Sequence, residues 1–284
     1  MQYAWALGSS LNYTIPDMLL RNDKQTGTQK MVANNQQLFT SENAKTPKGE
    51  KHKIKTFVLY LASGDKSVQT FGKKGGIDVC PNRSKACFEY CIDNQGRGNF
   101  DAVKLARLRK TKQYKLNPAK FKGQCSAEIG RKIRWWANNR PDWKLAIRAD
   151  GTSDLGIGRA ICDQHPEAAF YDYTKNIGVI RKHAKGHYSN NYHITYSWSG
   201  ENKLNCLEAL LRGYNVAVPF RHLRAGPHQP KKLKWHPEEF LSFPVVSGEN
   251  DDLRFLDPAP VVVALSPKGR AIHDDSGFVV RGIW

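Results

Sequence analysis

The sequence predicts an α/β fold, namely a βα-repeat barrel or a partial, TIM-like barrel with a basic helical insertion and an N-terminal extension. In the second half of the chain, short apolar runs alternate with helix-length segments, as βα units with parallel strands do. Another apolar run, TFVLYLA, precedes them and is bounded by Ser63 and Gly64. With 284 residues the chain is near the size of a complete barrel and can bury its own core.

The N-terminal segment is predicted to lie outside this barrel. Residues 1–53 contain polar, aperiodic sequence such as NNQQLFTSENAKTPKGEKHK, which suits an extension or arm better than a core element. Its lysines favour contact with a polyanion, although a solvated terminus explains them equally well. Residues 54–284 are then expected to form a single barrel-like domain.

Helices and strands can be placed in order along this domain. Apolar residues at helical spacing, with basic residues between them, predict helices over 101–116 and 124–139. Later strands are predicted where apolar and β-branched residues cluster, at WKLAIRA (143–149), AAFYDYT (168–174), YHITYSWS (192–199), YNVAVPF (214–220) and PVVVAL (260–265). Right-handed crossovers put the loops after parallel strands on one face, so ligand chemistry is expected there.

The motif CPNRSKACFEYC has the spacing C-x6-C-x3-C, formed by Cys80, Cys87 and Cys91. Three thiolates so close in sequence can converge on one metal centre. Zinc usually takes four protein ligands, often from CxxC pairs, and no second pair exists here. The spacing therefore favours an iron-sulfur cluster (4Fe-4S), with zinc or metal-free thiols as alternatives. Cys206, after a predicted strand, and Cys125, expected at a helix start, are candidate fourth ligands.

Several short motifs occur in an order that resembles a known family. They are CFEYC, AIRADGTSD, FYDYTKN, ITYSWSGEN and SPKGRAIHDDSGF. Over residues 54–282 the chain is similar to the phage and mobile-element family called gene product eighty-eight. The cysteine position also resembles that of radical S-adenosylmethionine enzymes, although their usual spacing is C-x3-C-x2-C. The resemblance implies a cluster with one open iron, S-adenosylmethionine as its ligand, and a phage or plasmid setting. It implies no particular reaction.

Polar residues follow the predicted strands at the same face as the cysteine motif. They are candidates for catalysis or cofactor binding: Asp150, Asp154, Lys175, Glu201 and Asn202. Asp154 and Asn202 could equally be helix caps, a common role for these residue types.

The formal charge of +18 indicates a polyanionic partner. Basic residues are dense between 104 and 134, and those expected to contact nucleic acid are Lys104, Arg107, Arg109, Lys110, Lys112, Arg131, Lys132 and Arg134. Trp135 and Trp136 follow and could stack on unpaired bases, but burial against the barrel is the favoured expectation for both. A solvated helix face is the alternative for the basic run, and the sequence does not distinguish DNA from RNA.

No run is apolar enough for a membrane helix, and no signal peptide is evident, so the cytoplasm is expected, that of the host cell if a phage or plasmid encodes the protein. The absence of GxSxG and P-loop motifs weakens hydrolase and ATPase functions. Three functions stay open: a radical-type enzyme acting on nucleic acid or another phage target, a non-catalytic DNA/RNA-binding or replication protein with a structural cluster, and a zinc-stabilised nucleic-acid module. The oligomeric state is not predicted.

Overall fold

The structure is a computed structural model that describes residues 37–41, 46–94, 96–222 and 236–282. Most of the predicted arm therefore lies outside the described residues. The compact unit begins at Gln37. Two elements before residue 54 belong to it, because β1 (Phe39–Thr40) pairs with β2 (Ile54–Leu59) and a 3-10 helix spans Thr46–His52 just before β2.

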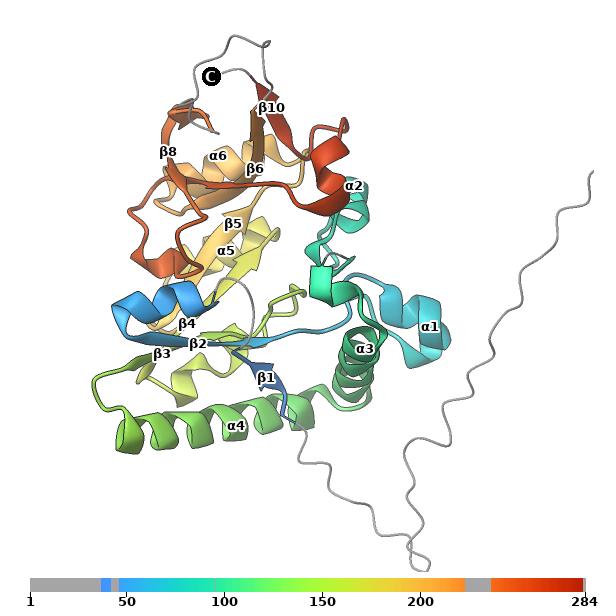
Figure 1. The fold of residues 1–284 in the computed structure, drawn as a ribbon, viewed down its shortest axis with the longest axis vertical. Coiled ribbons are helices and arrows are strands. Elements are labelled where there is room, and N and C mark those ends of the chain that lie inside the picture. Colours follow the sequence, from blue (N-terminus) through green and yellow to red (C-terminus); the bar gives the residue numbers. More distant parts are fainter. Residues whose placement is uncertain (1–36, 42–45, 95, 223–235, 283–284) are drawn as a thin grey trace, which may run out of the picture. The chain divides into compact units, whose positions relative to one another are not determined.

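The centre of the fold is a mostly parallel sheet with the order β1-β2-β3-β4-β5-β6-β9-β8-β7 among the described residues, with β10 beside β6 (Figure 1). The strands after β2 are β3 (Lys144–Arg148), β4 (Ala168–Thr174), β5 (Tyr192–Ser197), β6 (Val216–His222), β7 (Glu239–Phe240), β8 (Phe243–Ser247), β9 (Val262–Leu265) and β10 (Val280–Gly282). From β2 to β6 each strand pairs in parallel with the next one in sequence. The predicted βα alternation is confirmed over this part except between β3 and β4, where the chain forms only two short 3-10 helices, Gly158–Ala160 and Cys162–Gln164.

The α-helices lie in the connections from β2 to β3, from β4 to β5 and from β5 to β6. They are α1 (Lys66–Gly75), α2 (Lys85–Glu89), α3 (Asp101–Leu116), α4 (Pro118–Asn139), α5 (Ile177–Ala184) and α6 (Lys203–Leu211). The predicted helix over 101–116 is confirmed. The next helix begins at Pro118 and not at residue 124, because Asn117 caps it by accepting a hydrogen bond from the Lys120 amide (2.9 Å). Cys125 consequently lies inside a helix and not at its start.

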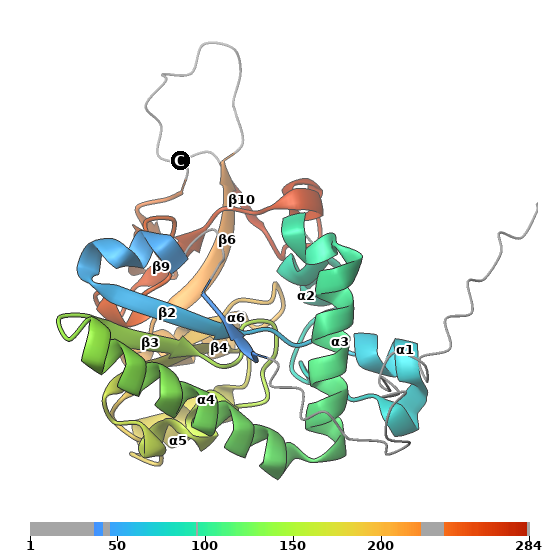
Figure 2. The same cartoon turned by 60° about the horizontal axis from the view of Figure 1, so that its bottom comes forward.

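The main core lies between the sheet and α4, α5 and α6. Phe57 of β2, Phe121 of α4, Ile180 of α5 and Leu210 of α6 all belong to one buried apolar cluster. Figure 2 shows α4 running along β2 and β3, with α3 standing near its N-terminal end. The helices therefore cover one face of the sheet and leave the other face to be filled by different parts of the chain.

The opposite face is filled by the segment Asp251–Asp257. Leu253 packs there with Ile54 and Tyr171. Asp252 accepts hydrogen bonds from Arg148 (2.9 Å) and from the Tyr171 hydroxyl (3.1 Å). Buried charges of this kind are tolerated when they are paired, so this segment seals the face with both apolar and ionic contacts.

The predicted barrel does not close, and the TIM-like barrel is not confirmed. Among the described residues the sheet is open, because its two ends, β1 and β7, pair only with β2 and β8. After β6 the chain stops alternating between strands and long helices, and β9 and β8 extend the sheet away from β2. The Asp251–Asp257 segment then covers the face that a closed barrel would turn inward. The fold is thus a mixed α/β structure with an open sheet.

Candidate functional site

The three cysteines of the motif lie on the segment after β2, at the carboxyl edge of the sheet. We name residues 78–93 the cysteine loop. Cys80 precedes α2, Cys87 lies in it and Cys91 follows it. Ser84 caps this short helix by accepting a hydrogen bond from the Cys87 amide (3.1 Å), and its hydroxyl donates to the Ser199 carbonyl (2.8 Å). This contact ties the cysteine loop to the segment after β5.

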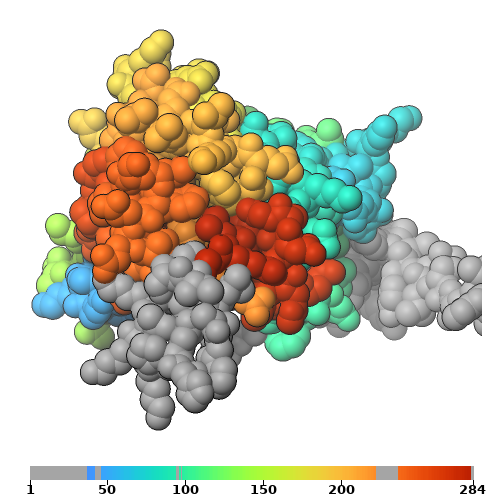
Figure 3. All heavy atoms as spheres, turned by 90° about the horizontal axis from the view of Figure 1, so that it is seen from above, coloured from blue at the N-terminus to red at the C-terminus, as the bar shows by residue number. Residues whose placement is uncertain are grey.

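The C-terminal tail also supports the cysteine loop. Tyr90 stacks on Phe278 with ring centroids 6.2 Å apart, and Arg270 donates to the Glu89 carbonyl (3.0 Å). The space-filling view shows the tail, in red, lying against the region of α2, in teal (Figure 3). The C-terminal tail, although far away in sequence, therefore lies directly beside the cysteine loop.

The three thiols share one electrostatic neighbourhood. Burial raises the pKa of Cys80 to about 12, and the charges of Cys91 and Cys87 raise it as well, while Lys175 lowers it. Burial likewise raises the pKa of Cys91, against a hydrogen bond with Ser63 that lowers it. Nearby charges shift a pKa only over short distances, so the three thiols influence one another electrostatically. Over the described part of the chain, no three His, Cys, Asp or Glu side chains form a group that could hold a single metal ion.

A buried carboxylate fixes the end of the cysteine loop. Asp93 is only 4% exposed and accepts hydrogen bonds from the Ser63 amide (3.2 Å), the Ser63 hydroxyl (2.8 Å) and Lys66 (2.7 Å). It also forms an ion pair with Arg107 of α3. Asp93 thereby joins the end of β2, α1 and α3 two residues after Cys91. No local sequence pattern connects Asp93 with these partners, so its role could not be predicted from the sequence.

Lys175 follows β4 and lies close to the thiols. Its ammonium donates to the Ser197 hydroxyl (2.8 Å) at the end of β5, and its charge lowers the pKa of Cys80, Cys91 and Cys206. Its amide donates to Asp154 (3.0 Å), whose carboxylate also accepts from Thr174 (2.8 Å). Burial raises the pKa of Asp154. Asp154 therefore holds the segment that carries Lys175 and caps no helix.

Two other predicted polar residues build loops. Asp150 accepts hydrogen bonds from the Ser153 hydroxyl (2.6 Å) and from the Ile157 amide (2.8 Å). Asn202 accepts from the Ser199 amide (2.8 Å), and its side chain makes no cap hydrogen bond to α6. Glu201 beside it is exposed. All three residues follow strands at the carboxyl edge of the sheet. Asp150 and Asn202 use their side chains for hydrogen bonds within the loops there.

The remaining cysteines are buried. Cys206 lies in α6, donates to Asn202 (3.5 Å), and has its pKa raised by burial to about 12. Cys125 lies in the core within α4, and Cys162 donates to the Arg159 carbonyl (3.7 Å). Of the three, Cys206 shares Lys175 as a charged neighbour with the cysteine loop.

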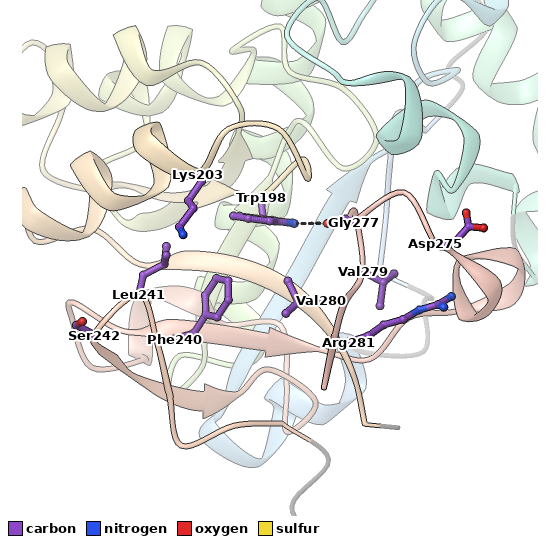
Figure 4. Close-up of a pocket in the computed structure, with 10 residues that line it drawn as sticks. All are labelled: Trp198, Lys203, Phe240, Leu241, Ser242, Asp275, Gly277, Val279, Val280 and Arg281. Carbon is purple, nitrogen blue, oxygen red and sulfur yellow. Dashed lines mark hydrogen bonds between the residues drawn. The ribbon is translucent and has the colours of Figure 1, made fainter. Parts of the chain in front are cut away.

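A cavity of about 710 Å³ opens beside β10 and the start of α6 (Figure 4). Trp198 is held at its wall by donating from Nε1 to the Gly277 carbonyl (3.3 Å). Phe240 and Val280 supply further apolar lining, and Lys203 extends toward Leu241. These residues come from separate parts of the chain, and no sequence motif predicts the cavity.

The predicted nucleic-acid residues divide by environment. Arg107, Lys110 and Lys132 are partly buried and have partners within the fold, which are Asp93, the Leu38 carbonyl (3.1 Å) and Glu128 (3.4 Å). The exposed members are Lys104, Arg131 and Arg134, whereas Arg109 is half-buried and Lys112 lies over the Phe71 ring (5.2 Å). 

The two tryptophans after the basic run also differ. Trp136 packs against the core, as expected. Trp135 is 55% exposed, so its expected burial is wrong. Consecutive helix residues point in different directions, and only one of them can face the core.

No helix among the described residues is both long and apolar enough to cross a membrane. Neither the curated proteins nor the solved structures include a match to the chain. The family model described as Gene product 88 matches residues 28–282. This match covers most of the sequence, and the chain therefore belongs to the Gene product 88 family.

Proposed function

We propose that this protein of a phage or plasmid binds a 4Fe-4S cluster through its cysteine loop and associates with nucleic acid in the host cytoplasm. The observation that carries the cluster assignment is the shared neighbourhood of Cys80, Cys87 and Cys91 beside Lys175. Cluster ligands are thiolates, and a nearby cation favours the thiolate over the thiol. The donor chemistry of the three thiols suits a cluster, although burial holds the pKa of Cys80 and Cys91 above the usual thiol value.

A cluster held by three cysteines would leave one iron for an outside ligand. In this proposal S-adenosylmethionine would be that ligand, and a cluster held by Cys80, Cys87 and Cys91 would supply one-electron chemistry once an external electron donor had reduced it. Lys175 and Glu201 lie at the same edge of the sheet, where Lys175 can bind an anionic group of a ligand. Cleavage of S-adenosylmethionine would depend on this open iron. A fourth protein ligand would occupy the iron and make the cluster structural.

The nucleic-acid part of the proposal rests on charge. The chain has 44 Lys and Arg against 26 Asp and Glu, and exposed cations remain on α3 and α4 after the buried ones are paired. Such groups bind phosphates with an affinity that falls as salt rises.

Anaerobic reconstitution with metal analysis tests the cluster. We expect a brown protein with about four irons per chain. Cys87→Ala should lose the iron, whereas the control Cys162→Ala should keep it, because Cys162 is not in the motif. A colourless protein with zinc would favour the zinc alternative, and unchanged iron in Cys87→Ala would refute the cysteine assignment.

A second variant separates an enzyme from a structural protein. Cys206→Ala should keep the cluster if three cysteines hold it, and S-adenosylmethionine should then change the electron paramagnetic resonance spectrum of the reduced protein. Loss of iron in Cys206→Ala would indicate four protein ligands and favour a non-catalytic role.

A further inference from the structure

The outer face of α4 is a continuous exposed surface. Phe121, Cys125 and Ile129 turn into the core, whereas residues three or four positions apart on the other side are exposed. We name these residues the α4 outer face: Lys120, Gln124, Ala127, Arg131, Arg134, Trp135 and Asn138. They occupy one side of a helix of 22 residues.

This face has cations but no carboxylate. Glu128, the one acidic residue in the α4 sequence, is buried on the other side. There it accepts hydrogen bonds from the amides of Leu38 (2.7 Å) and Phe39 (3.2 Å). Lys120, Arg131 and Arg134 therefore give the outer face a local positive charge that complements a phosphate backbone.

Trp135 adds an aromatic ring to the same face. Its ring meets Trp136 at 69° with centroids 5.4 Å apart, and Trp136 packs in turn on Trp143 at 5.4 Å. Its own carbonyl accepts a hydrogen bond from the Asn139 side chain (2.7 Å). Although 55% exposed, the indole is supported from one side and needs little ordering before it stacks on a partner. Arg131, four positions earlier, is its neighbour on the helix surface.

We propose that the α4 outer face binds single-stranded nucleic acid, with phosphates on Lys120, Arg131 and Arg134 and an unpaired base stacked on Trp135. This inference rests on the nucleic-acid association proposed above and names the form of the nucleic acid. A base inside a duplex has no free face for the indole, whereas an unpaired base does. Positive charge alone would bind single strands and duplexes alike. Trp135 therefore supplies the preference for single strands.

Fluorescence anisotropy with the full-length protein and labelled oligothymidylate, oligouridylate and a duplex of equal length tests the stacking. Trp135→Ala should weaken binding of the single strands by about tenfold and leave the duplex nearly unchanged. Trp135→Phe should restore most of the affinity. The control Leu116→Ala also removes an exposed apolar side chain, 75% exposed, and should have no effect.

The phosphate contacts are tested by salt titration. Arg131→Glu with Arg134→Glu should reduce the salt slope on single strands by about 1.4, at about 0.7 per contact. The control pair Lys182→Glu in α5 and Lys185→Glu at its C-cap changes the net charge equally and should leave the slope unchanged.

The outcomes distinguish this inference from the function it depends on. If the protein binds single strands but Trp135→Ala binds them equally well, or if the α5 pair matters as much as the α4 pair, the assignment of this face is overturned. If no oligonucleotide binds at any salt concentration, the nucleic-acid association itself is overturned.

Discussion

The basic run between residues 104 and 134 contains two sets of cations in opposite situations. The inner set, Arg107, Lys110 and Lys132, turns toward the fold and has partners there. The outer set, Lys120, Arg131 and Arg134, faces solvent along α4. The two sets have the same chemistry and are interleaved in sequence. The comparison teaches that a basic run in a sequence overstates the charge available to a polyanion. Only the cations that have no buried acceptor in the fold can be expected to contact one.

The inner set is expected to matter for folding and the outer set for binding. A buried charge that loses its partner keeps its desolvation cost, so breaking such a pair is expensive. Exposed charges are hydrated in both the folded and unfolded states and contribute little to stability.

Asp93→Ala should have the largest effect. It leaves Lys66 and Arg107 without their shared carboxylate and should lower the free energy of unfolding by about 3–5 kcal/mol in urea denaturation. Asp101→Ala is the matched control, because Asp101 is 94% exposed and its contact with Lys104 is 3.7 Å. A similar decrease in the free energy of unfolding in both variants would mean that burial does not decide how much a cation and its partner contribute to stability.

Lys110→Met should have an intermediate, pH-dependent effect. Burial, followed by the charge of Arg107, lowers the pKa of Lys110 from 10.5 to about 8 in the folded protein. Between these two values the unfolded chain binds more protons than the folded one, so wild-type stability should rise with pH. Allowing for partial exposure, we expect a rise of about 1–2 kcal/mol that Lys110→Met lacks.

Urea midpoints measured for both proteins at pH values spanning this window check the prediction. Because Lys110 also donates to the Leu38 carbonyl, the variant can start from a lower stability. The informative quantity is therefore the slope with pH. Parallel curves for the two proteins would show that Lys110 is not desolvated.

Arg131→Gln should have the smallest effect on folding. An exposed side chain without a buried partner usually changes stability by less than about 0.5 kcal/mol. The thermal midpoint should therefore stay close to that of the wild type. A clear decrease would place Arg131 in the inner set and weaken its assignment to nucleic acid.

The sequence predicted the part of the fold that local patterns control. Parallel neighbours from β2 to β6 follow from the alternation of apolar runs and helical segments, and α3 was predicted with its observed bounds. Asn117 and Pro118 mark the start of α4 and could have been recognised as a cap and first helical residue. Closure of the sheet was not predictable, because it depends on how β9, β8 and the Asp251–Asp257 segment pair and pack at long range.

The candidate site shows the same limit. Cys80, Cys87 and Cys91 lie within twelve residues, so their proximity could be predicted from spacing. Asp93 could not be identified in this way, because its partners Ser63 and Arg107 come from separate elements. Asp150 was predicted by position as a ligand-binding residue, whereas its hydrogen bonds show that it shapes a loop.

The open sheet has a consequence for association between molecules. An unpaired strand edge can accept a strand from another chain, and a closed barrel would avoid this. Here the outermost strands, β1 and β7, contain two residues each and run antiparallel to their neighbours. An incoming strand would find too short a ladder for lasting hydrogen bonding. Within the part of the chain that the structure describes, these two strands therefore disfavour edge-to-edge pairing at the ends of the open sheet.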